Sequence, residues 1–228
     1  MKKIAFIGGF DKLDLIQYAA IVLFNIGKKS IIVDTTKMQK SRYITPAIDN
    51  TKERYITTSQ GVDLAVGFRS YQDLVEELSL TEDTYDYMFI DIDNYEVFKT
   101  FQLTQNDLIF LTSTFDLYSL KVGFEVISQF QNNEIVNKIL LAKTITPYHV
   151  QYVHHVCKSC NITWGNISIF FPYDNGDLTI IFENQREHKM SLNKFSKDFL
   201  GSLLDLCVTI EPEMAKQIRK FIRAQSRN

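Results

Sequence analysis

The strongest constraint on the fold of this chain is the alternation of short, almost continuously apolar runs with segments of helical periodicity. The runs are rich in β-branched residues, and they occupy residues 3–7, 28–34, 86–93, 107–113, 138–144 and 166–172. Between them apolar residues recur at helical spacing, as in residues 13–26 and 117–129. Strands that are apolar on both faces and alternate with helices are typical of parallel sheets covered on both sides. The sequence therefore predicts an α/β fold with a mostly parallel sheet and helices on both faces.

The remaining segments give weaker patterns. Near the end of the chain we predict a β-ribbon at residues 177–183 and two helices, at residues 192–207 and 213–225. The middle segment, residues 43–68, is interrupted by turn-forming proline, asparagine and glycine residues. It is predicted to hold a single strand, at residues 54–58.

The turn after the first apolar run carries two adjacent glycines and a lysine, in the order Ile7-Gly8-Gly9-Phe10-Asp11-Lys12-Leu13-Asp14. Ligands of open parallel sheets bind at the carboxyl ends of the strands, so this turn is the first candidate for a binding site. A glycine turn that leads into a helix also presents backbone N–H groups to phosphate. A plain tight connection without a ligand is the alternative interpretation.

This loop resembles the deviant Walker A loop of the ParA/MinD family of P-loop nucleotide-binding proteins, whose pattern is KGGxGK[ST][ST]. The alignment needs no gap between the loop and Gly27, the glycine before the second strand. Later segments follow in family order, and residues 106–127 resemble a family segment that packs the core and borders the dimer face. The resemblance implies a P-loop NTPase architecture in which Gly8 and Gly9 surround phosphates and Lys12 binds them.

The loop departs from the family pattern at four positions. Ile7 replaces the lysine that reaches the partner subunit, Asp11 replaces the third glycine, and Leu13 and Asp14 replace the two hydroxyl residues. Leu13 offers no oxygen to Mg²⁺. Asp11 would add a carboxylate beside the phosphates, and one like-charge pair at ~4 Å costs about 4 kcal/mol at an effective dielectric constant of about 20. We therefore expect no certain cofactor and, at most, weak binding of ATP with Mg²⁺.

Other family positions lie at the ends of later strands. The resemblance implies that Asp34 positions an attacking water and that Asp91 is the Walker B aspartate, although strand-end aspartates also cap turns. Lys143 stands where the family has a base-reading asparagine. A lysine donates hydrogen bonds but cannot accept them, so adenine selectivity is expected to be weak or absent. The turn that contains Pro172 and Asp174 corresponds to a family turn near the base.

A cysteine and histidine cluster has a zinc-like CxxC spacing, at His154, His155, Cys157 and Cys160. A structural zinc site would need a further pair of ligands, and Cys207 is far along the chain. We therefore expect core cysteines and no metal site. Three cysteines in all also favour reduced thiols over a disulfide framework.

The last predicted helix has an apolar stripe that contains Ile218 and Ile222 beside several lysines and arginines. Such a helix either docks on the protein with a solvated basic face or lies on an anionic membrane or a partner. Apolar groups at Ile7 and Phe10 are expected to be exposed at the loop, where they would mark a protein contact.

Composition limits the functions that are open to the chain. The formal net charge of −2 gives no support to non-specific binding of nucleic acid. No apolar run reaches the about 20 residues that cross a bilayer, so a cytoplasmic location is expected, with peripheral contact at the inner face of the membrane as an alternative. The chain, residues 1–228, is expected to be one domain, because no linker composition or internal repeat is present.

Three functional hypotheses follow from these observations. The first is a non-catalytic or very slow bacterial ParA/MinD-like protein that acts as a positioning or assembly factor through protein contacts and forms a homodimer. Its setting would be a pilus, secretion, division or segregation machinery. The second is an active ATPase whose unusual loop serves a dimerisation switch, since Lys12, Asp34 and Asp91 are kept. The third is a membrane-surface or DNA-associated module that uses the basic last helix.

Overall fold

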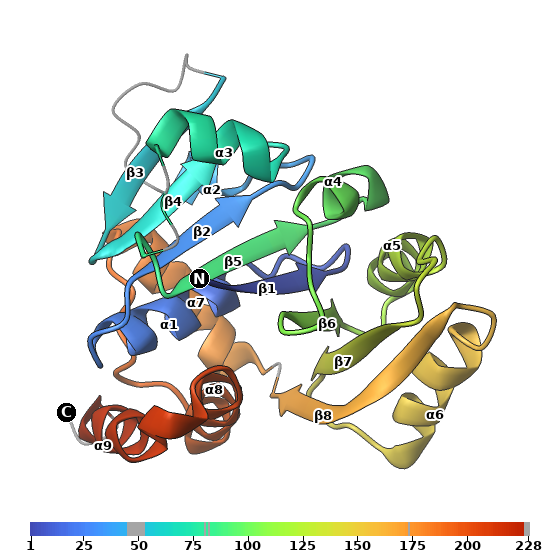
Figure 1. Cartoon of the computed structure of the whole chain (residues 1–228). Helices are drawn as coiled ribbons and strands as arrows, with labels where there is room; N and C mark the ends of the chain where they lie inside the picture. Colours follow the sequence, from blue (N-terminus) through green and yellow to red (C-terminus); the bar gives the residue numbers. More distant parts are fainter. Residues whose placement is uncertain (45–52, 80, 82, 173, 226–228) are drawn as a thin grey trace.

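A mostly parallel sheet of eight strands forms the centre of the molecule (Figure 1). The computed structural model describes residues 1–44, 53–79, 81, 83–172 and 174–225. The strands are β1 (Lys2–Ile7), β2 (Ser30–Asp34), β3 (Tyr55–Ser59), β4 (Val62–Val66), β5 (Tyr87–Ile92), β6 (Leu108–Ser113), β7 (Glu134–Leu141) and β8 (Ile162–Phe171). Their spatial order is β3-β4-β2-β5-β1-β6-β7-β8, and only β3 and β4 pair antiparallel. The predicted α/β class is confirmed.

Helices cover both faces of this sheet. They are α1 (Leu13–Phe24), α2 (Ser41–Ile44), α3 (Tyr71–Leu78), α4 (Tyr95–Thr100), α5 (Leu117–Ile127), α6 (Pro147–Val156), α7 (Asn175–Glu187), α8 (Lys197–Ile210) and α9 (Ala215–Gln225). One core packs α1, α7, α8 and α9 against the sheet, and a second core on the other face packs α3, α4, α5 and α6. Alternate residues of β1 enter the two cores, with Ile4 and Phe6 in one and Ala5 and Ile7 in the other. This arrangement explains why the strands are apolar at nearly every position.

Side-chain caps set the start of five helices, α3, α4, α5, α7 and α8. The cap residue accepts a hydrogen bond from a backbone N–H two or three positions further on, which satisfies a donor that has no partner inside the helix. These caps are Ser70, Asn94, Asp116, Asp174 and Ser196. Helix α8 begins at Lys197 and not at the predicted residue 192, because Ser196 caps its first turn.

The predicted β-ribbon at residues 177–183 is wrong, because this segment is part of helix α7. Its β-branched run resembles a strand in isolation. The helix forms because Asp174 caps its first turn and because it buries Asp177 and Asn184 against other helices. The Asp177 carboxylate accepts hydrogen bonds from the backbone N–H and the hydroxyl of Ser196, at 2.8 and 2.7 Å.

The middle segment holds two strands where one was predicted. Strand β3 lies near the predicted residues 54–58, and β4 follows it through a tight turn at Gln60 and Gly61, whose φ angles are 50° and 81°. Two central residues with positive φ are typical of the hairpin turn that matches the twist of paired strands. In the sequence Gly61 was read only as an interruption of this segment. Pro46 and its neighbours lie outside the described residues.

Other boundaries also differ from prediction. Strand β8 starts at Ile162, four residues before the predicted start at 166, and its register with β7 shifts between Val136 and Lys138. A 3₁₀ turn, Pro212–Met214, precedes α9. None of the helices in the described part of the chain is both long and apolar enough to cross a membrane.

Gly8 provides a test of the loop backbone. Its φ is +153°, and a Cβ there would lie 2.1 Å from the backbone oxygen of Thr112. We expect Gly8→Ala to lower the free energy of unfolding by about 3 kcal/mol or more, because a backbone atom cannot move aside as a side chain does. Urea denaturation measures this change. The matched control is Gly201→Ala in α8, where a Cβ has nothing within 4 Å and helix propensity predicts a gain of about 0.5–1 kcal/mol. Equal effects of the two substitutions would contradict the loop geometry.

Candidate functional site

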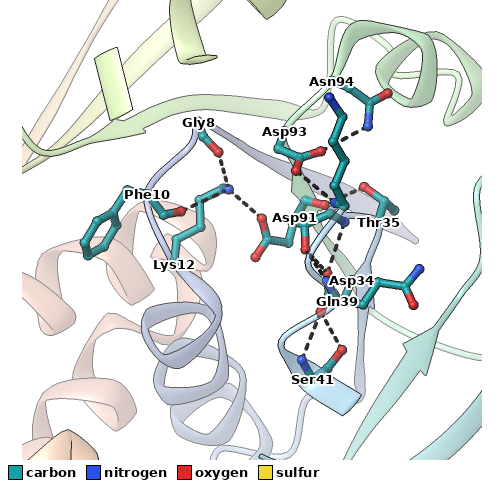
Figure 2. Close-up of polar contacts among 12 residues, drawn as sticks. Gly8, Phe10, Lys12, Asp34, Thr35, Gln39, Ser41, Asp91, Asp93 and Asn94 are labelled. Atoms are coloured by element: carbon teal, nitrogen blue, oxygen red, sulfur yellow. Dashed lines mark hydrogen bonds and ion pairs between the residues drawn. The ribbon is translucent and has the colours of Figure 1, made fainter. Parts of the chain in front are cut away.

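The carboxyl ends of β1, β2 and β5 bring the predicted loop and the two predicted strand-end carboxylates together. Asp34 and Asp91 are direct neighbours in the pairing of β2 with β5, and Ile7 is opposite Ile92 in the pairing of β1 with β5. The Thr35 N–H donates to the Asp91 backbone oxygen at 3.2 Å, which continues the ladder past the end of β2. The loop after β1 therefore begins beside both carboxylates (Figure 2).

Lys12 is turned into the protein. Its side chain is 1% exposed, and its Nζ lies 2.5 Å from Asp91 Oδ1. The same ammonium donates to the backbone oxygens of Gly8, at 2.7 Å, and Phe10, at 3.4 Å (Figure 2). Burial raises the pKa of Asp91, and the Lys12 cation opposes that rise. All of the interactions described for this ammonium are thus made with the protein itself.

Asp34 is a turn-capping residue in this structure. One of its carboxylate oxygens accepts from the Thr36 N–H at 3.1 Å and the Thr36 hydroxyl at 2.6 Å. The other accepts from the Ser41 N–H at 3.1 Å and the Ser41 hydroxyl at 2.5 Å. Asp34 is 1% exposed, and its carboxylate holds the chain between β2 and α2 (Figure 2). The capping alternative for Asp34 is therefore the geometry that is observed.

The two acidic residues of the loop share one cation, Lys40, which the sequence did not single out. Lys40 Nζ forms an ion pair with Asp11 and a second one with Asp14 at 2.8 Å. Gln185 of α7 donates to both oxygens of Asp14, at 2.8 and 2.9 Å. Burial raises the pKa of Asp14, whereas Lys40 and Gln185 lower it. For Lys40, burial lowers the pKa but the neighbouring carboxylates outweigh this effect and raise it.

The expected exposure of Ile7 is wrong. Ile7 is the last residue of β1 and is 0% exposed, because it packs into the second core with its neighbours in the sheet. Leu13 is also buried, at 1% exposure, as the first residue of α1. Phe10 is half-buried against the first core, and its ring extends to the side opposite Asp91 (Figure 2). Of the apolar residues predicted to be exposed at the loop, only Phe10 retains exposed surface.

A pocket connects the loop to the turn before α7. Phe10, Asp11 and Asp14 line it on one side, and Pro172 and Asp174 line it on the other. Its remaining walls are mainly apolar side chains of β8, α7 and α8, and Lys40 is its one cation among the lining residues. The structure therefore brings together the predicted loop and the predicted base turn, although Asp174 also caps α7 through Gly176 and Asp177.

Lys143 lies in a neighbouring pocket. It is exposed just after β7 and shares the lining of that pocket with Pro172, Pro147 of α6 and Ser202 of α8. The loop residues that surround Lys12 do not line this pocket. Lys143 is thus close to the predicted base turn but is separate from the phosphate loop.

An apolar patch at the same edge of the sheet was missed by the sequence analysis. Leu117 and Tyr118 at the start of α5 are 63% and 70% exposed, and Tyr148 at the start of α6 is 71% exposed. The rings of Phe115 and His149 meet between the two helix starts, with centroids 4.6 Å apart. We call Leu117, Tyr118 and Tyr148 the edge patch. Helix α5 itself lies beside the loop, since a Cβ at Gly9 would lie 2.8 Å from its residue Val122.

The other two motifs of the sequence have clear positions. In α9, Ile218 and Ile222 are 0% and 4% exposed and pack toward α1 and α8, so the apolar stripe is already buried and the basic residues face outward. Cys157 is buried in the second core, and Cys160 is half-buried beside it. The described residues hold no group of three or more histidine, cysteine, aspartate or glutamate side chains that could bind a metal ion.

Comparisons with known proteins identify the architecture. A scan of protein-family models finds no match to the chain, and a search of curated proteins finds none either. Among solved structures, the MinD cell division protein of Aquifex aeolicus matches with a TM-score of 0.56 over 93% of this chain and 97% of that one, at 12% identity.

Two further solved structures cover the chain to a similar extent. A Borrelia burgdorferi B31 structure described as a plasmid partition protein bound to AMPPNP matches with a TM-score of 0.50 over 93% of this chain and 99% of its own, at 12% identity. A ParA family ATPase from Chlorobium tepidum TLS covers 97% and 98% at 13% identity, with a TM-score of 0.49. The eight-stranded sheet and its helices match the MinD/ParA P-loop NTPase architecture. At these identities the likeness is one of fold.

The buried ion pair gives a direct test of the loop geometry. We expect Lys12→Met to lower the free energy of unfolding by about 3–5 kcal/mol, because it leaves the buried Asp91 carboxylate without its cation. Adding Asp91→Leu should recover most of this loss, since the pair is then replaced by apolar groups. A double-mutant cycle measured by urea denaturation gives the coupling.

Lys37 provides the matched control, because it is an exposed lysine at the same edge of the sheet. Lys37→Met should change stability by no more than about 0.5 kcal/mol. If Lys12→Met proves as harmless as Lys37→Met, Lys12 is not held by Asp91 in solution.

Proposed function

We propose that this chain is a ParA/MinD-like P-loop protein that does not hydrolyse ATP and that works as a positioning or assembly factor through protein contacts. By their printed names, the structural neighbours include a cell division protein and a plasmid partition protein. The fold supports a positioning or partitioning role of that kind. The loss of ATP chemistry rests on the side chains of the loop.

One observation carries the proposal: the charged side chains of the loop are paired within the chain. The ammonium that would meet phosphate is buried against Asp91 and two backbone oxygens. A phosphate loop works because a cation, close backbone N–H groups and a hydroxyl-bound metal meet a polyanion together. Here the hydroxyl position holds buried Leu13, and Asp11 and Asp14 bring two carboxylates that require Lys40 for neutralisation. This donor set does not fit Mg·ATP.

The alternative of an active ATPase needs Asp34 and Asp91 to face a nucleotide and a metal ion. Asp34 instead has its two oxygens saturated by Thr36 and Ser41. Asp91 is 3% exposed and neutralises Lys12. Both retained carboxylates therefore have an internal structural role that accounts for their presence, and this supports the non-catalytic proposal.

The edge patch supports the second part of the proposal, action through protein contacts. Aromatic side chains are enriched in the cores of protein interfaces. Three large apolar side chains, at Leu117, Tyr118 and Tyr148, are each more than half exposed at the starts of α5 and α6.

We expect Mg·ATP to bind with a Kd above about 100 μM, a binding free energy no stronger than about −5.5 kcal/mol, with no turnover above background. The reason is the unfavourable charge of Asp11 and Asp14 and the missing metal oxygen at Leu13. Isothermal titration calorimetry on protein stripped of bound ligand, together with a phosphate-release assay, measures both quantities. Steady phosphate release that disappears in Lys12→Ala would contradict the proposal.

A variant that restores the family pattern should gain affinity for Mg·ATP, and it tests the same argument in the opposite direction. Asp11→Gly together with Leu13→Thr should tighten Mg·ATP binding by several fold or more, since it removes a like charge and supplies a hydroxyl to the metal. Asp205→Asn is the control, because it removes an exposed carboxylate of α8 and should leave the affinity unchanged. If the double change has no effect, the assignment of residues 7–14 to a phosphate loop is wrong.

We expect the oligomeric state to be independent of ATP, because packing rather than trapped nucleotide would hold any contact. Analytical ultracentrifugation with and without Mg·ATP should give the same sedimentation coefficient. Where self-association is seen, Tyr118→Ser with Tyr148→Ser should weaken it at least about tenfold, or 1.4 kcal/mol. Phe10→Ser tests whether the half-buried ring of the loop belongs to the same contact.

Ile135 is the control for the edge patch, because it is 60% exposed at the opposite end of β7. Ile135→Thr keeps a β-branched side chain and should leave association unchanged. An ATP-dependent shift from monomer to dimer would contradict the proposal and would favour the alternative of a nucleotide-dependent dimerisation switch.

A further inference from the structure

A second cluster of reactive side chains lies away from the loop, under the end of α6 and against β7 and β8. It contains Lys138 of β7, His154 and Cys157 of α6, Cys160 of the following turn and Trp164 of β8. Figure 1 shows α6 beside β7 and β8, at the side of the sheet opposite β3. None of these residues takes part in the candidate site at the carboxyl edge, so the inference below does not rest on the proposed function.

The two cysteines are held in a tight turn. Cys157 is the C-cap of α6, and the Cys160 N–H donates to the Cys157 backbone oxygen at 3.0 Å. A turn closed by a bond between residues i and i+3 keeps their Cα atoms within about 7 Å, which is the range that a disulfide spans. Each thiol also shifts the pKa of the other, which agrees with their closeness in this turn. The pair is therefore arranged to join without a large movement of the backbone.

The surroundings differ for the two sulfurs. Cys157 is 5% exposed and lies in the second core, whereas Cys160 is half-buried and reachable from solvent. Cys207, the third cysteine, is 0% exposed and lies in the core on the other face of the sheet. A reagent in solution therefore reaches Cys160 first. Cys157 is placed to attack a mixed disulfide that forms at Cys160.

Lys138 supplies a buried positive charge beside this pair. It is 3% exposed, and its ammonium lies 4.3 Å from the centroid of the Trp164 ring. Among the described residues Lys138 forms no ion pair, and the thiol of Cys157 is the acidic group that its charge acts upon. Burial lowers the pKa of His154, and the Lys138 charge lowers it further, so His154 is neutral near Lys138 at physiological pH. The Lys138 charge stabilises the Cys157 thiolate whenever this thiol loses its proton, against the effect of burial.

We propose that Cys157 and Cys160 are a redox-active dithiol that forms an intramolecular disulfide by exchange with a small-molecule disulfide of the glutathione type. In the first step the Cys160 thiolate attacks one sulfur of oxidised glutathione, and one glutathione thiolate leaves. In the second step the Cys157 thiolate, beside Lys138, attacks the sulfur of Cys160 and expels the second glutathione thiolate. Two cysteine thiols are oxidised, one glutathione disulfide is reduced to two thiols, and the two cysteine protons pass to solvent and then to those thiols.

The environment sets the speed of this exchange. Burial raises the pKa of Cys157 to about 12, which the charge of Lys138 opposes, and burial also raises the pKa of Cys160. Because the thiolate is the attacking species, exchange is slow at neutral pH. The same high pKa values make both sulfurs poor leaving groups, so the disulfide persists once it has formed.

The sequence offers an unusually direct assay, because Lys158 lies between the two cysteines. Trypsin cleaves after Lys143, Lys158 and Arg186, so residues 144–158 and 159–186 become separate peptides unless a disulfide joins them. The reduced full chain would be equilibrated in buffers of reduced and oxidised glutathione, quenched with acid, alkylated, digested and analysed by mass spectrometry. We expect the linked pair of peptides to appear as the oxidised fraction of glutathione rises, with Cys207 alkylated only in denaturant.

Three variants make the test decisive. Cys157→Ser should stop at a mixed disulfide of Cys160 with glutathione, and Cys160→Ser should react far more slowly, because the buried thiol remains alone. Lys138→Met should slow formation of the linked peptides by about threefold or more, because the attacking thiolate loses its cation. Two free thiols at Cys157 and Cys160 at every buffer ratio, or a mixed disulfide that Cys157 never displaces in the unmodified chain, would overturn the proposal. An unchanged rate in Lys138→Met would overturn the role given to that lysine.

Discussion

The ion pair between Lys12 and Asp91 links the loop after β1 to the end of β5, and the architecture of the carboxyl edge depends on it. Both side chains are almost fully buried, and the lysine also bonds to the Gly8 and Phe10 backbone oxygens. A buried pair of this kind contributes little net stability by itself, but losing one partner is costly because an uncompensated charge remains. The loop backbone next to Gly8 is therefore held by a contact with the end of the neighbouring strand.

Three further carboxylates of this edge are likewise paired or hydrogen-bonded within the chain. Asp11 and Asp14 share Lys40, and Asp34 receives its hydrogen bonds from Thr36 and Ser41. The charged side chains of the loop and of the two strand ends are thus already paired or hydrogen-bonded within the chain. Large apolar side chains at the starts of α5 and α6 remain exposed nearby, and together these features motivate a function based on protein contacts. The dithiol beside Lys138 lies at a different part of the sheet and is independent of that edge.

The sequence predicted secondary structure best in segments where burial requires a particular pattern of apolar residues. The central parallel strands were predicted because a strand between two helical layers must be apolar on both faces, as Ile4, Ala5 and Phe6 are. The helix at Asn175–Glu187 was mistaken for a ribbon because its β-branched run favours a strand locally, whereas the decisive interactions join Asp177 to Ser196 and Asn184 to Tyr18. Such contacts between remote residues leave no periodic pattern in the sequence.

The sequence by itself determined the class of fold and the chemical inventory of the loop, since the glycine turn and the substitutions at Asp11 and Leu13 are local facts. Only the tertiary structure decided the direction of Lys12, the partner of Lys40 and the burial of Ile7. The physical reason is that these depend on the strand order β2-β5-β1, which places residues 12 and 91 or 14 and 40 in contact. Strand order is selected by the packing of the entire sheet, and no single segment of the chain encodes it.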